Sequence, residues 1–178
     1  MGRLIVSAQM TMDGVMDQME GWFDPVSESE TEGLEELRAA DALVIGRETY
    51  EHFSSYWPSG SGEYAELVNP IPKFVASRTL SGPLEWNAQL LGPDLAAEVK
   101  ALKAEYPGQL ITYGCGELAS NLARLGLIDE VRLRVHPIAW GDGVRPFHAG
   151  KLPLKLRLIS AKTFASGIVS LTYEPQPE

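Results

Sequence analysis

The sequence predicts an α/β fold with a mixed, mainly parallel central sheet, flanking helices and an antiparallel C-terminal hairpin. Short apolar, β-branched segments alternate with helical patterns through the first two thirds of the chain, which is typical of parallel strands joined by helices. The last two strand-like segments, near 155–159 and 168–174, are separated by a turn at 165–167 and no helix. The length of 178 residues and the hydrophobic content of 44% suit a single domain over 1–178.

The first half of the chain begins with a strand and a capped helix. Two overlapping Ser-x-x-Glu capping boxes in 27–32 (SESETE) predict a helix start, and Leu34 and Leu37 are expected to be its buried residues. Apolar runs and turn signals then divide this half into strand 3–9, a helix to about residue 40, strand 41–46, helix 47–53 and the Ser/Gly/Pro-rich surface loop 54–64.

The second half of the chain ends in strands with one apolar side. In 130–136 (EVRLRVH), Val131, Leu133 and Val135 alternate with charged or polar residues, which predicts a one-sided strand that is antiparallel or lies at an edge. The other elements expected before it are strands at 73–77 and 109–113, a strand within 85–91, and helices at 93–106 and 117–125.

Charge and cysteine content exclude several classes of protein. The formal net charge of −9 argues against nonspecific binding to nucleic acid or to an anionic membrane surface. Cys115 is the only cysteine, which excludes an internal disulfide framework and fits a reducing compartment. The sequence has no apolar run of membrane-spanning length and no secretory signal pattern at its start, so we expect a cytoplasmic protein.

A Gly-x-Gly at 114–116 separates the strand-like QLITY from a helical pattern. Leu118, Leu122 and Leu125 share one face of this helix, and Gly126 is its expected C-terminal cap. Backbone N–H groups at a helix start carry partial positive charge and bind anions where no side chain blocks the approach. The alternative interpretation is a tight turn that needs glycine for its conformation alone.

Three strand ends carry phosphate-binding chemistry. They are Gly46-Arg47-Glu48-Thr49, Ser77-Arg78-Thr79 and Gly114-Cys115-Gly116. In open α/β sheets, ligands bind at the carboxyl ends of the strands. Together these ends supply guanidinium groups, hydroxyls and two helix starts, which suit a dinucleotide with an additional 2′-phosphate. Each of these three segments alone could also be an ordinary surface or turn segment.

The sequence also resembles a known family. The segments SAQMTMDG, VIGRETYE, KFVASRTL, YGCGELA and LIDEVRLRVHPIAWGDG, with Phe147, are similar in order to the RibD C-terminal domain family, relatives of dihydrofolate reductase. The resemblance covers nearly the whole chain and implies a dihydrofolate reductase-like fold with NADPH as cofactor. The implied cofactor-binding residues are Gly46, Arg47, Thr49, Ser77, Arg78, Thr79, Gly114, Cys115, Gly116, Glu117 and Leu118. The third glycine and the ribose-binding acid of a Rossmann fingerprint are missing.

Candidates on the substrate side come from the first loop and the loop at 54–64. Asp13 matches the Asp of the S-x-D-G stretch of riboflavin-pathway reductases, with Thr11 in place of the serine, and it would hold the substrate or relay a proton. The alternative for Asp13-Gly14 is a plain turn. Dihydrofolate reductases use an acid at the start of the first long helix, where Asp24 is one of four carboxylates. Methionine and aromatic side chains in these loops suit an apolar substrate pocket, but they could equally cover the sheet edge or form a subunit contact. The candidate substrate-binding residues are Met12, Trp22 and Trp57.

The combined expectation is an NADPH-dependent oxidoreductase that reduces a small pteridine- or pyrimidine-like heterocycle. Preference for NADPH over NADH rests on Arg47 and Arg78. A riboflavin-pathway pyrimidine reductase acting on 5-amino-6-(5-phosphoribosylamino)uracil is one alternative, although 4–37 lacks a cation for its phosphate. A non-catalytic NADPH-binding sensor and a structural homodimer with a vestigial cleft are two rival interpretations. The zinc deaminase signature of bifunctional riboflavin enzymes is missing, no metal-ligand spacing is present, and a homodimer is expected.

Overall fold

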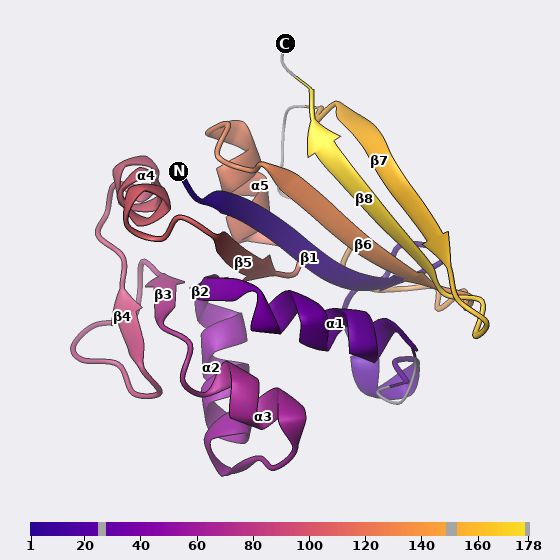
Figure 1. Ribbon diagram of the computed structural model, residues 1–178, viewed down its shortest axis with the longest axis horizontal. Coiled ribbons are helices and arrows are strands. Elements are labelled where there is room, and N and C mark those ends of the chain that lie inside the picture. Colours follow the sequence, from indigo (N-terminus) through magenta and orange to yellow (C-terminus); the bar gives the residue numbers. More distant parts are fainter. Residues whose placement is uncertain (25–27, 149–152, 177–178) are drawn as a thin grey trace. The chain divides into compact units, whose positions relative to one another are not determined.

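The computed structural model describes residues 1–24, 28–148 and 153–176 (Figure 1). Among these residues, eight strands form a mixed sheet in the order β4-β3-β2-β5-β1-β6-β8-β7. The predicted fold class is therefore confirmed: the sheet is mostly parallel, it has an antiparallel C-terminal hairpin, and helices flank it. The elements are β1 (Arg3–Thr11), η1 (Met19–Gly21), α1 (Glu28–Arg38), β2 (Ala40–Gly46), α2 (Arg47–Tyr56), η2 (Trp57–Ser59), α3 (Glu63–Val68), β3 (Lys73–Ala76), β4 (Ala88–Leu90), α4 (Leu95–Glu105), β5 (Gln109–Tyr113), α5 (Glu117–Arg124), β6 (Glu130–His136), β7 (Leu156–Thr163) and β8 (Val169–Pro175).

The chain divides into two compact units, which are described separately. The first unit comprises residues 1–4 and 34–113, and the second comprises 5–33 and 114–178. In the first unit, β2 pairs in parallel with β3 on one side and with β5 on the other, and β3 pairs in parallel with β4. Helices connect β2 to β3 and β4 to β5, and the loop 77–87 connects β3 to β4. Such long connections are what parallel pairing requires, since a hairpin turn cannot join two parallel strands.

Apolar runs build the core of the first unit. Leu43, Val44 and Ile45 of β2 are fully buried, as are Leu110 and Ile111 of β5. Strands that are buried on both faces show such uninterrupted apolar runs, which explains why these segments could be recognised from sequence.

A buried lysine in the first unit connects α3 with the segment before β4. Lys73 at the start of β3 is fully buried, and its Nζ donates hydrogen bonds to the carbonyls of Val68 at 2.6 Å and Asn69 at 2.8 Å. The same ammonium lies 3.9 Å from the centre of the Trp86 ring. Carbonyl oxygens and the negative face of an indole stabilise a cation, so Lys73 joins α3 to the segment before β4.

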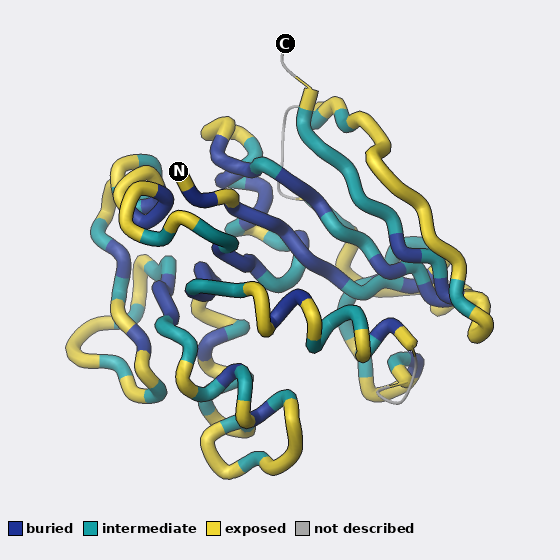
Figure 2. Tube along the Cα trace, viewed as in Figure 1, coloured by how far each residue is buried: buried dark blue, intermediate teal, exposed yellow. Residues whose placement is uncertain are grey.

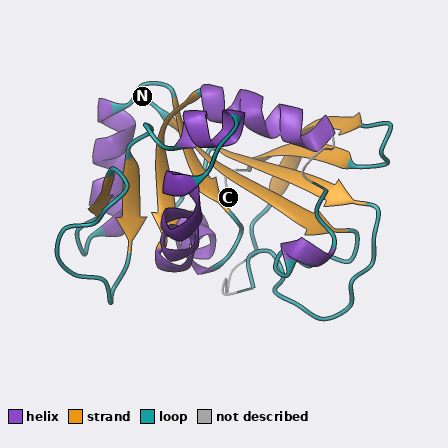
Figure 3. Ribbon diagram, turned by 90° about the horizontal axis from the view of Figure 1, so that it is seen from below, coloured by secondary structure: helices purple, strands orange, loops and turns teal. Residues whose placement is uncertain are grey.

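The second unit combines one parallel pair with two antiparallel pairs. β1 runs parallel to β6, which pairs antiparallel with β8, and β8 pairs antiparallel with β7. Helices and strands are coloured separately in Figure 3, where β7 and β8 form a hairpin without a helix between them. Figure 2 shows β1 buried over most of its length and β7 largely exposed, as expected for an inner and an edge strand.

The structure corrects the prediction for β6. We expected a one-sided strand that is antiparallel or lies at an edge. The strand does pair antiparallel with β8, but it lies inside the sheet, because it also pairs in parallel with β1. Its polar side chains Glu130, Arg134 and His136 are buried, whereas Leu133 and Val135 are only half-buried. Alternation correctly predicted two different faces, but it did not show which face the rest of the unit covers.

Three helix predictions also need correction. Helix α2 extends to Tyr56, and the 3-10 helix η2 and the start of α3 fall in the segment that we expected to be a loop. Leu34 is half-buried rather than buried, although Leu37 is 1% exposed. In α5, Leu122 is buried but Leu125, at the C-terminal cap, is 42% exposed. The Ser27 part of the predicted capping boxes lies outside the described residues.

Candidate functional site

In the first unit, two of the predicted phosphate-binding segments lie side by side. Gly46 at the end of β2 and Ala76 at the end of β3 are partners in the parallel register. Arg47 and Ser77 directly follow these two residues, so both leave the sheet at the same level, on strands about 4.8 Å apart. The sequence prediction that these segments share one edge is consistent with this register.

The hydrogen bonds of these segments define what each side chain can offer a ligand. Arg47 forms an ion pair with Glu51, with Nη1 3.0 Å from Oε2, and its exposed position allows the guanidinium to exchange partners. Ser77 Oγ accepts hydrogen bonds from the backbone N–H groups of Thr79 and Leu80, which closes the turn after β3. Arg78 follows Ser77 in this turn and is exposed.

Helix α2 adds backbone donors next to Arg47. Its N-terminal cap is Gly46, and no side chain of the described ranges caps this helix start. Thr49 lies in the first turn and is half-buried. N–H groups at such an end are suited to an anion, and the cofactor-binding role of Gly46, Arg47 and Thr49 stays a prediction.

Trp57, a predicted substrate contact, belongs to an aromatic cluster of the first unit. Its ring centre lies 4.4 Å from that of Tyr64 and 4.9 Å from that of Tyr56. The side-chain amide of Asn69 donates to its backbone carbonyl at 3.0 Å. These contacts explain its position by packing, and a role in substrate binding stays a prediction.

In the second unit, the Gly-x-Gly forms the predicted turn between strand and helix. Gly114 has a φ of +82°, a conformation that L residues adopt only with strain, and Gly116 is the N-terminal cap of α5. A Cβ atom built on either glycine would meet no atom within 4 Å. The space above both glycines is thus open, and the start of α5 has no side-chain cap in the described residues. Glu117 and Leu118 form the first residues of that helix.

The side chain of Cys115 points into the core, away from the open space over Gly114 and Gly116. Its side chain is fully buried, and its carbonyl accepts a hydrogen bond from the backbone N–H of Phe147 at 2.7 Å. Burial raises the pKa of the thiol to about 12, so it is protonated and unreactive at neutral pH. Any contact of Cys115 with a cofactor would therefore involve its backbone.

Asp13 joins two loops of the second unit. Its carboxylate accepts hydrogen bonds from the Thr11 hydroxyl at 2.6 Å and from the backbone N–H groups of Trp140 at 3.0 Å and Gly141 at 2.7 Å. These hydrogen bonds, the one from Thr11 above all, hold the pKa of Asp13 well below its usual range. Asp13 is therefore an ionised anchor at neutral pH.

The other predicted residues of the first loop differ in exposure. Met12 is 66% exposed, whereas Trp22 is 9% exposed and donates from its indole nitrogen to the carbonyl of Asp17 at 2.9 Å. The Trp22 ring also meets the ring of His136 edge-on, with the two centres 5.1 Å apart. Burial lowers the pKa of His136, and the charge of the exposed Asp24 opposes this shift without cancelling it.

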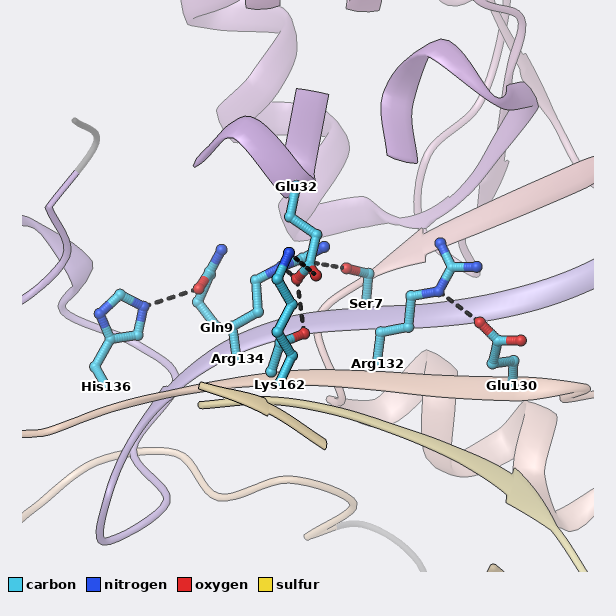
Figure 4. A network of polar contacts seen from close by, with 9 residues as sticks. Ser7, Gln9, Glu32, Glu130, Arg132, Arg134, His136 and Lys162 are labelled. Atoms are coloured by element: carbon cyan, nitrogen blue, oxygen red, sulfur yellow. Dashed lines mark hydrogen bonds and ion pairs between the residues drawn. The ribbon is translucent and has the colours of Figure 1, made fainter. Parts of the chain in front are cut away.

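A network of buried polar side chains, which the sequence did not reveal, lies on the face of β1 and β6 (Figure 4). Arg134 is 3% exposed; its Nε lies 2.9 Å from Glu32 Oε2 on α1, and its Nη1 lies 3.0 Å from Ser7 Oγ on β1. The Ser170 hydroxyl donates to the same Glu32 oxygen at 2.6 Å, and Lys162 Nζ lies 3.9 Å from Oε1. Each charge in this network thus has an opposite charge beside it.

Among the carboxylates at the start of α1, Glu32 is the one that points into this network. Burial alone would raise the pKa of Glu32, but the hydrogen bond from Ser170 and the charge of Arg134 outweigh it and lower the pKa. Burial raises the pKa of Glu30, and the charge of Arg134 opposes that shift. The only sequence signal for this network was the alternation of Arg132, Arg134 and His136, which also describes a solvated face.

Comparison with known proteins defines the family. The model of the RibD C-terminal domain matches residues 3–170. The chain belongs to the RibD C-terminal domain family. This membership supports a reductase of the riboflavin-pathway type. A relative from Bacillus subtilis, the uncharacterized protein YyaP, is 28% identical over 177 residues, which cover 96% of this chain and 94% of YyaP.

Solved structures show the same fold. A putative riboflavin biosynthesis protein from Shewanella sp. PV-4 superposes with a TM-score of 0.76 at 22% identity, covering 98% of this chain and 99% of the other. Dihydrofolate reductase from Enterococcus faecalis, solved with NADP(H), gives a TM-score of 0.69 at 14% identity, with 98% and 97% covered. This RibD C-terminal domain is thus dihydrofolate reductase-like in fold.

Two further observations concern metals and membranes. No group of three His, Cys, Asp or Glu side chains in the described ranges is arranged to hold a metal ion. None of the helices in those ranges combines the length and hydropathy that crossing a bilayer requires.

Proposed function

We propose that this protein is a cytoplasmic, NADPH-dependent reductase that transfers a hydride to a small pteridine- or pyrimidine-like heterocycle. The observation that carries the proposal is the open Gly114–Gly116 turn, whose glycines leave space over the start of α5. The N–H groups and partial positive charge of a helix start suit a diphosphate. The dihydrofolate reductase-like fold supports this choice, since the Enterococcus faecalis enzyme was solved with NADP(H).

The first unit carries further groups for which the sequence predicts phosphate binding. Arg47, Thr49 and the start of α2 would contact cofactor phosphates, and Ser77, Arg78 and Thr79 would hold the 2′-phosphate. A guanidinium binds a phosphate dianion through paired hydrogen bonds. NADH has no 2′-phosphate, so it cannot form these hydrogen bonds at that position. The register of β2 and β3 makes Gly46 and Ala76 neighbours, which supports a position of both segments at one edge of the sheet.

The chemistry divides between the cofactor and the chain. NADPH would supply the hydride, and the chain would hold the substrate and a path for one proton. A carboxylate with a lowered pKa has no proton to deliver at neutral pH, so we assign Asp13 to holding the loops that border the substrate. Asp24, which is exposed, or a water beside it would relay the proton. Met12 and Trp22 would border the heterocycle.

The paired charges in the second unit favour an uncharged heterocycle over a phosphorylated one. Arg134 is bonded to Glu32, and Arg132 Nε lies 2.5 Å from Glu130 Oε1. A substrate phosphate at Arg132 or Arg134 would have to displace a carboxylate and leave it partly buried, which is costly. The exposed Arg145 donates to the backbone carbonyls of Asp13 and Gly141 and is a cation that a phosphate could meet without this cost. The phosphoribosylamino-pyrimidine of riboflavin synthesis is therefore the second candidate substrate.

A homodimer is part of the proposal. On the second face of β6, β8 and β7, Leu133 pairs with Leu171, and Leu171 pairs with Ala161; none of these three is fully buried. Leu158 on the same strand as Ala161 is 50% exposed. An uncharged apolar strip suits an isologous contact between two copies. Leu158→Glu should shift the mass measured by light scattering from dimer to monomer, and an unchanged mass would remove this face from the interface.

Two matched glycine variants test the cofactor site. Gly116 and Gly33 both have space for an added Cβ and neither has a positive φ, but only Gly116 lies in the proposed diphosphate turn. We expect Gly116→Ala to weaken NADPH binding at least about tenfold in calorimetry because the methyl group hinders close approach to the backbone, whereas Gly33→Ala should bind as the wild type does. Equal affinity of all three proteins would refute a diphosphate at this turn.

A further inference from the structure

The polar face of the second unit contains one residue whose hydrogen bonding is only half used. In the parallel register, Gln9 on β1 pairs with Arg134 on β6, and Thr11 pairs with His136. Gln9 is therefore on the same face as the Arg134 network, two residues before the end of β1. Ligands of open α/β sheets bind at the carboxyl ends of such strands.

His136 fixes the orientation of the Gln9 side chain. Its Nε2 lies 2.8 Å from Oε1 of Gln9, so the ring nitrogen donates and the amide oxygen accepts. His136 is 3% exposed, and the rings of Trp22 and Phe23 meet it edge-on at 5.1 Å and 5.7 Å between centres. A ring that is buried and held on two sides keeps its orientation, and the bonded amide keeps its own.

The amide nitrogen of Gln9 is consequently the group available to a ligand. Figure 4 shows this nitrogen on the side of the amide away from His136. Within the described residues, His136 is the side-chain partner of Gln9, and no acceptor there contacts the amide nitrogen. Gln9 is half-buried, so its two N–H donors are partly removed from water yet not satisfied by the protein.

The surroundings of Gln9 indicate what it would bind. Arg134, the buried cation that pairs with Gln9 in the register, is bonded to Glu32, so Gln9 offers a neutral donor beside a paired charge. Trp22 and Phe23 bring aromatic rings to His136 at the same strand ends. A flat, uncharged ring with a carbonyl oxygen or ring nitrogen as acceptor matches this combination.

We propose that Gln9 determines substrate specificity by donating a hydrogen bond from its side-chain amide to an acceptor atom of an uncharged planar heterocycle, with His136 as the positioning residue. This inference rests on the proposed reductase function, because it concerns the substrate side of the same site. It adds a residue that family membership does not assign and a chemical requirement on the substrate.

The test uses Gln9→Glu, which has nearly the same shape. A carboxylate still accepts the hydrogen bond from His136 Nε2, but it has no N–H to donate to a ligand. Binding of two uncharged probes, 7,8-dihydrobiopterin and 5,6-diaminouracil, is measured by calorimetry on the NADPH-saturated wild type and variant. We expect the variant to bind NADPH normally and to bind the probe about 10- to 100-fold more weakly, as the loss of a donor to a desolvated acceptor implies.

The role of His136 is tested by His136→Phe, which keeps an aromatic ring against Trp22 and Phe23. The ¹⁵N-labelled wild type should show a shift of the Gln9 side-chain amide signals on probe binding. In His136→Phe the Gln9 amide loses the hydrogen bond that fixes it, so before the probe is added its two N–H signals should report an average over several side-chain orientations. Probe affinity should fall. NADPH affinity and thermal stability should stay near those of the wild type. Undisturbed amide signals and full probe affinity would remove the positioning role.

The outcomes separate this inference from the proposed function. Equal probe affinity for Gln9→Glu and the wild type would overturn the role of Gln9. If the NADPH-bound wild type binds neither probe, the assignment of an uncharged heterocycle is overturned while the cofactor assignment stands. Failure of the wild type to bind NADPH would instead refute the proposed reductase function.

Discussion

Replacing Glu32 by Ala should strongly destabilise the second unit. The change removes the carboxylate that lies 2.9 Å from Nε of the Arg134 guanidinium, which is 3% exposed. Removing one member of a buried ion pair costs about 3–5 kcal/mol. The Glu32 side chain is 25% exposed, so water can partly replace it, and we expect the lower end, about 3 kcal/mol.

The assay is urea unfolding at 25 °C and pH 7, followed by both tryptophan fluorescence and circular dichroism. With a denaturant slope of about 2 kcal/mol per M, a loss of about 3 kcal/mol moves the midpoint down by roughly 1.5 M. Glu35→Ala is the matched control, because Glu35 lies on the exposed side of the same helix and should change stability by less than about 0.5 kcal/mol.

A double-mutant cycle and a pH series test the reasoning further. Glu32→Met with Arg134→Met should cost less than the sum of the two single changes, since neither charge is then left alone. The folded-state pKa of Glu32 is lowered, so its stabilisation is complete above the unfolded value of 4.5 and is lost as the pH falls below it. A midpoint shift below about 0.5 M for Glu32→Ala, or strict additivity in the cycle, would refute a stabilising buried pair.

Three further outcomes are expected from other sites. Native Cys115 should resist a thiol reagent at pH 8 and react only on unfolding, because it is buried with its pKa raised to about 12; fast reaction of the native protein would contradict this. Lys73→Met should lower the unfolding free energy by about 2 kcal/mol in urea titrations, since the Val68 and Asn69 carbonyls lose their donor, and an unchanged midpoint would speak against it. Gly114→Ala should cost about 1–2 kcal/mol because of its φ of +82°, and a stability equal to the wild type would show that the turn relaxes.

The secondary structure of this chain was predictable where the apolar residues of a segment are also the ones that are buried. The run in 41–46 is apolar over most of its length, as expected for a strand such as β2 in which four consecutive residues are buried. Gly114 and Gly116 were recognisable because a strand, two glycines and a helical pattern follow one another within a few residues. The short helix α3 was missed because only Ala65 and Val68 are buried in it, too few to produce a periodic signal.

The candidate site was less predictable because its bonds connect residues far apart in the sequence. Asp13 receives hydrogen bonds from Trp140 and Gly141, 127 and 128 positions away, and local sequence cannot indicate such partners. The polar side of β6 looked solvated because nothing near it in the sequence shows that Glu32 covers Arg134. Charged residues are rarely buried without a partner, so the partner has to be known before burial can be inferred.

The most direct test of the central claim is whether the purified protein oxidises NADPH in the presence of 7,8-dihydrobiopterin, whose N5=C6 bond can accept a hydride and a proton. Oxidation is followed by the loss of reduced nicotinamide absorbance, with NADH compared at equal concentration. We predict substrate-dependent oxidation of NADPH, with NADPH used at least about tenfold more efficiently than NADH because of the cations after β2 and β3. Absence of any substrate-dependent oxidation, together with no NADPH binding in calorimetry, would contradict the assignment of a reductase.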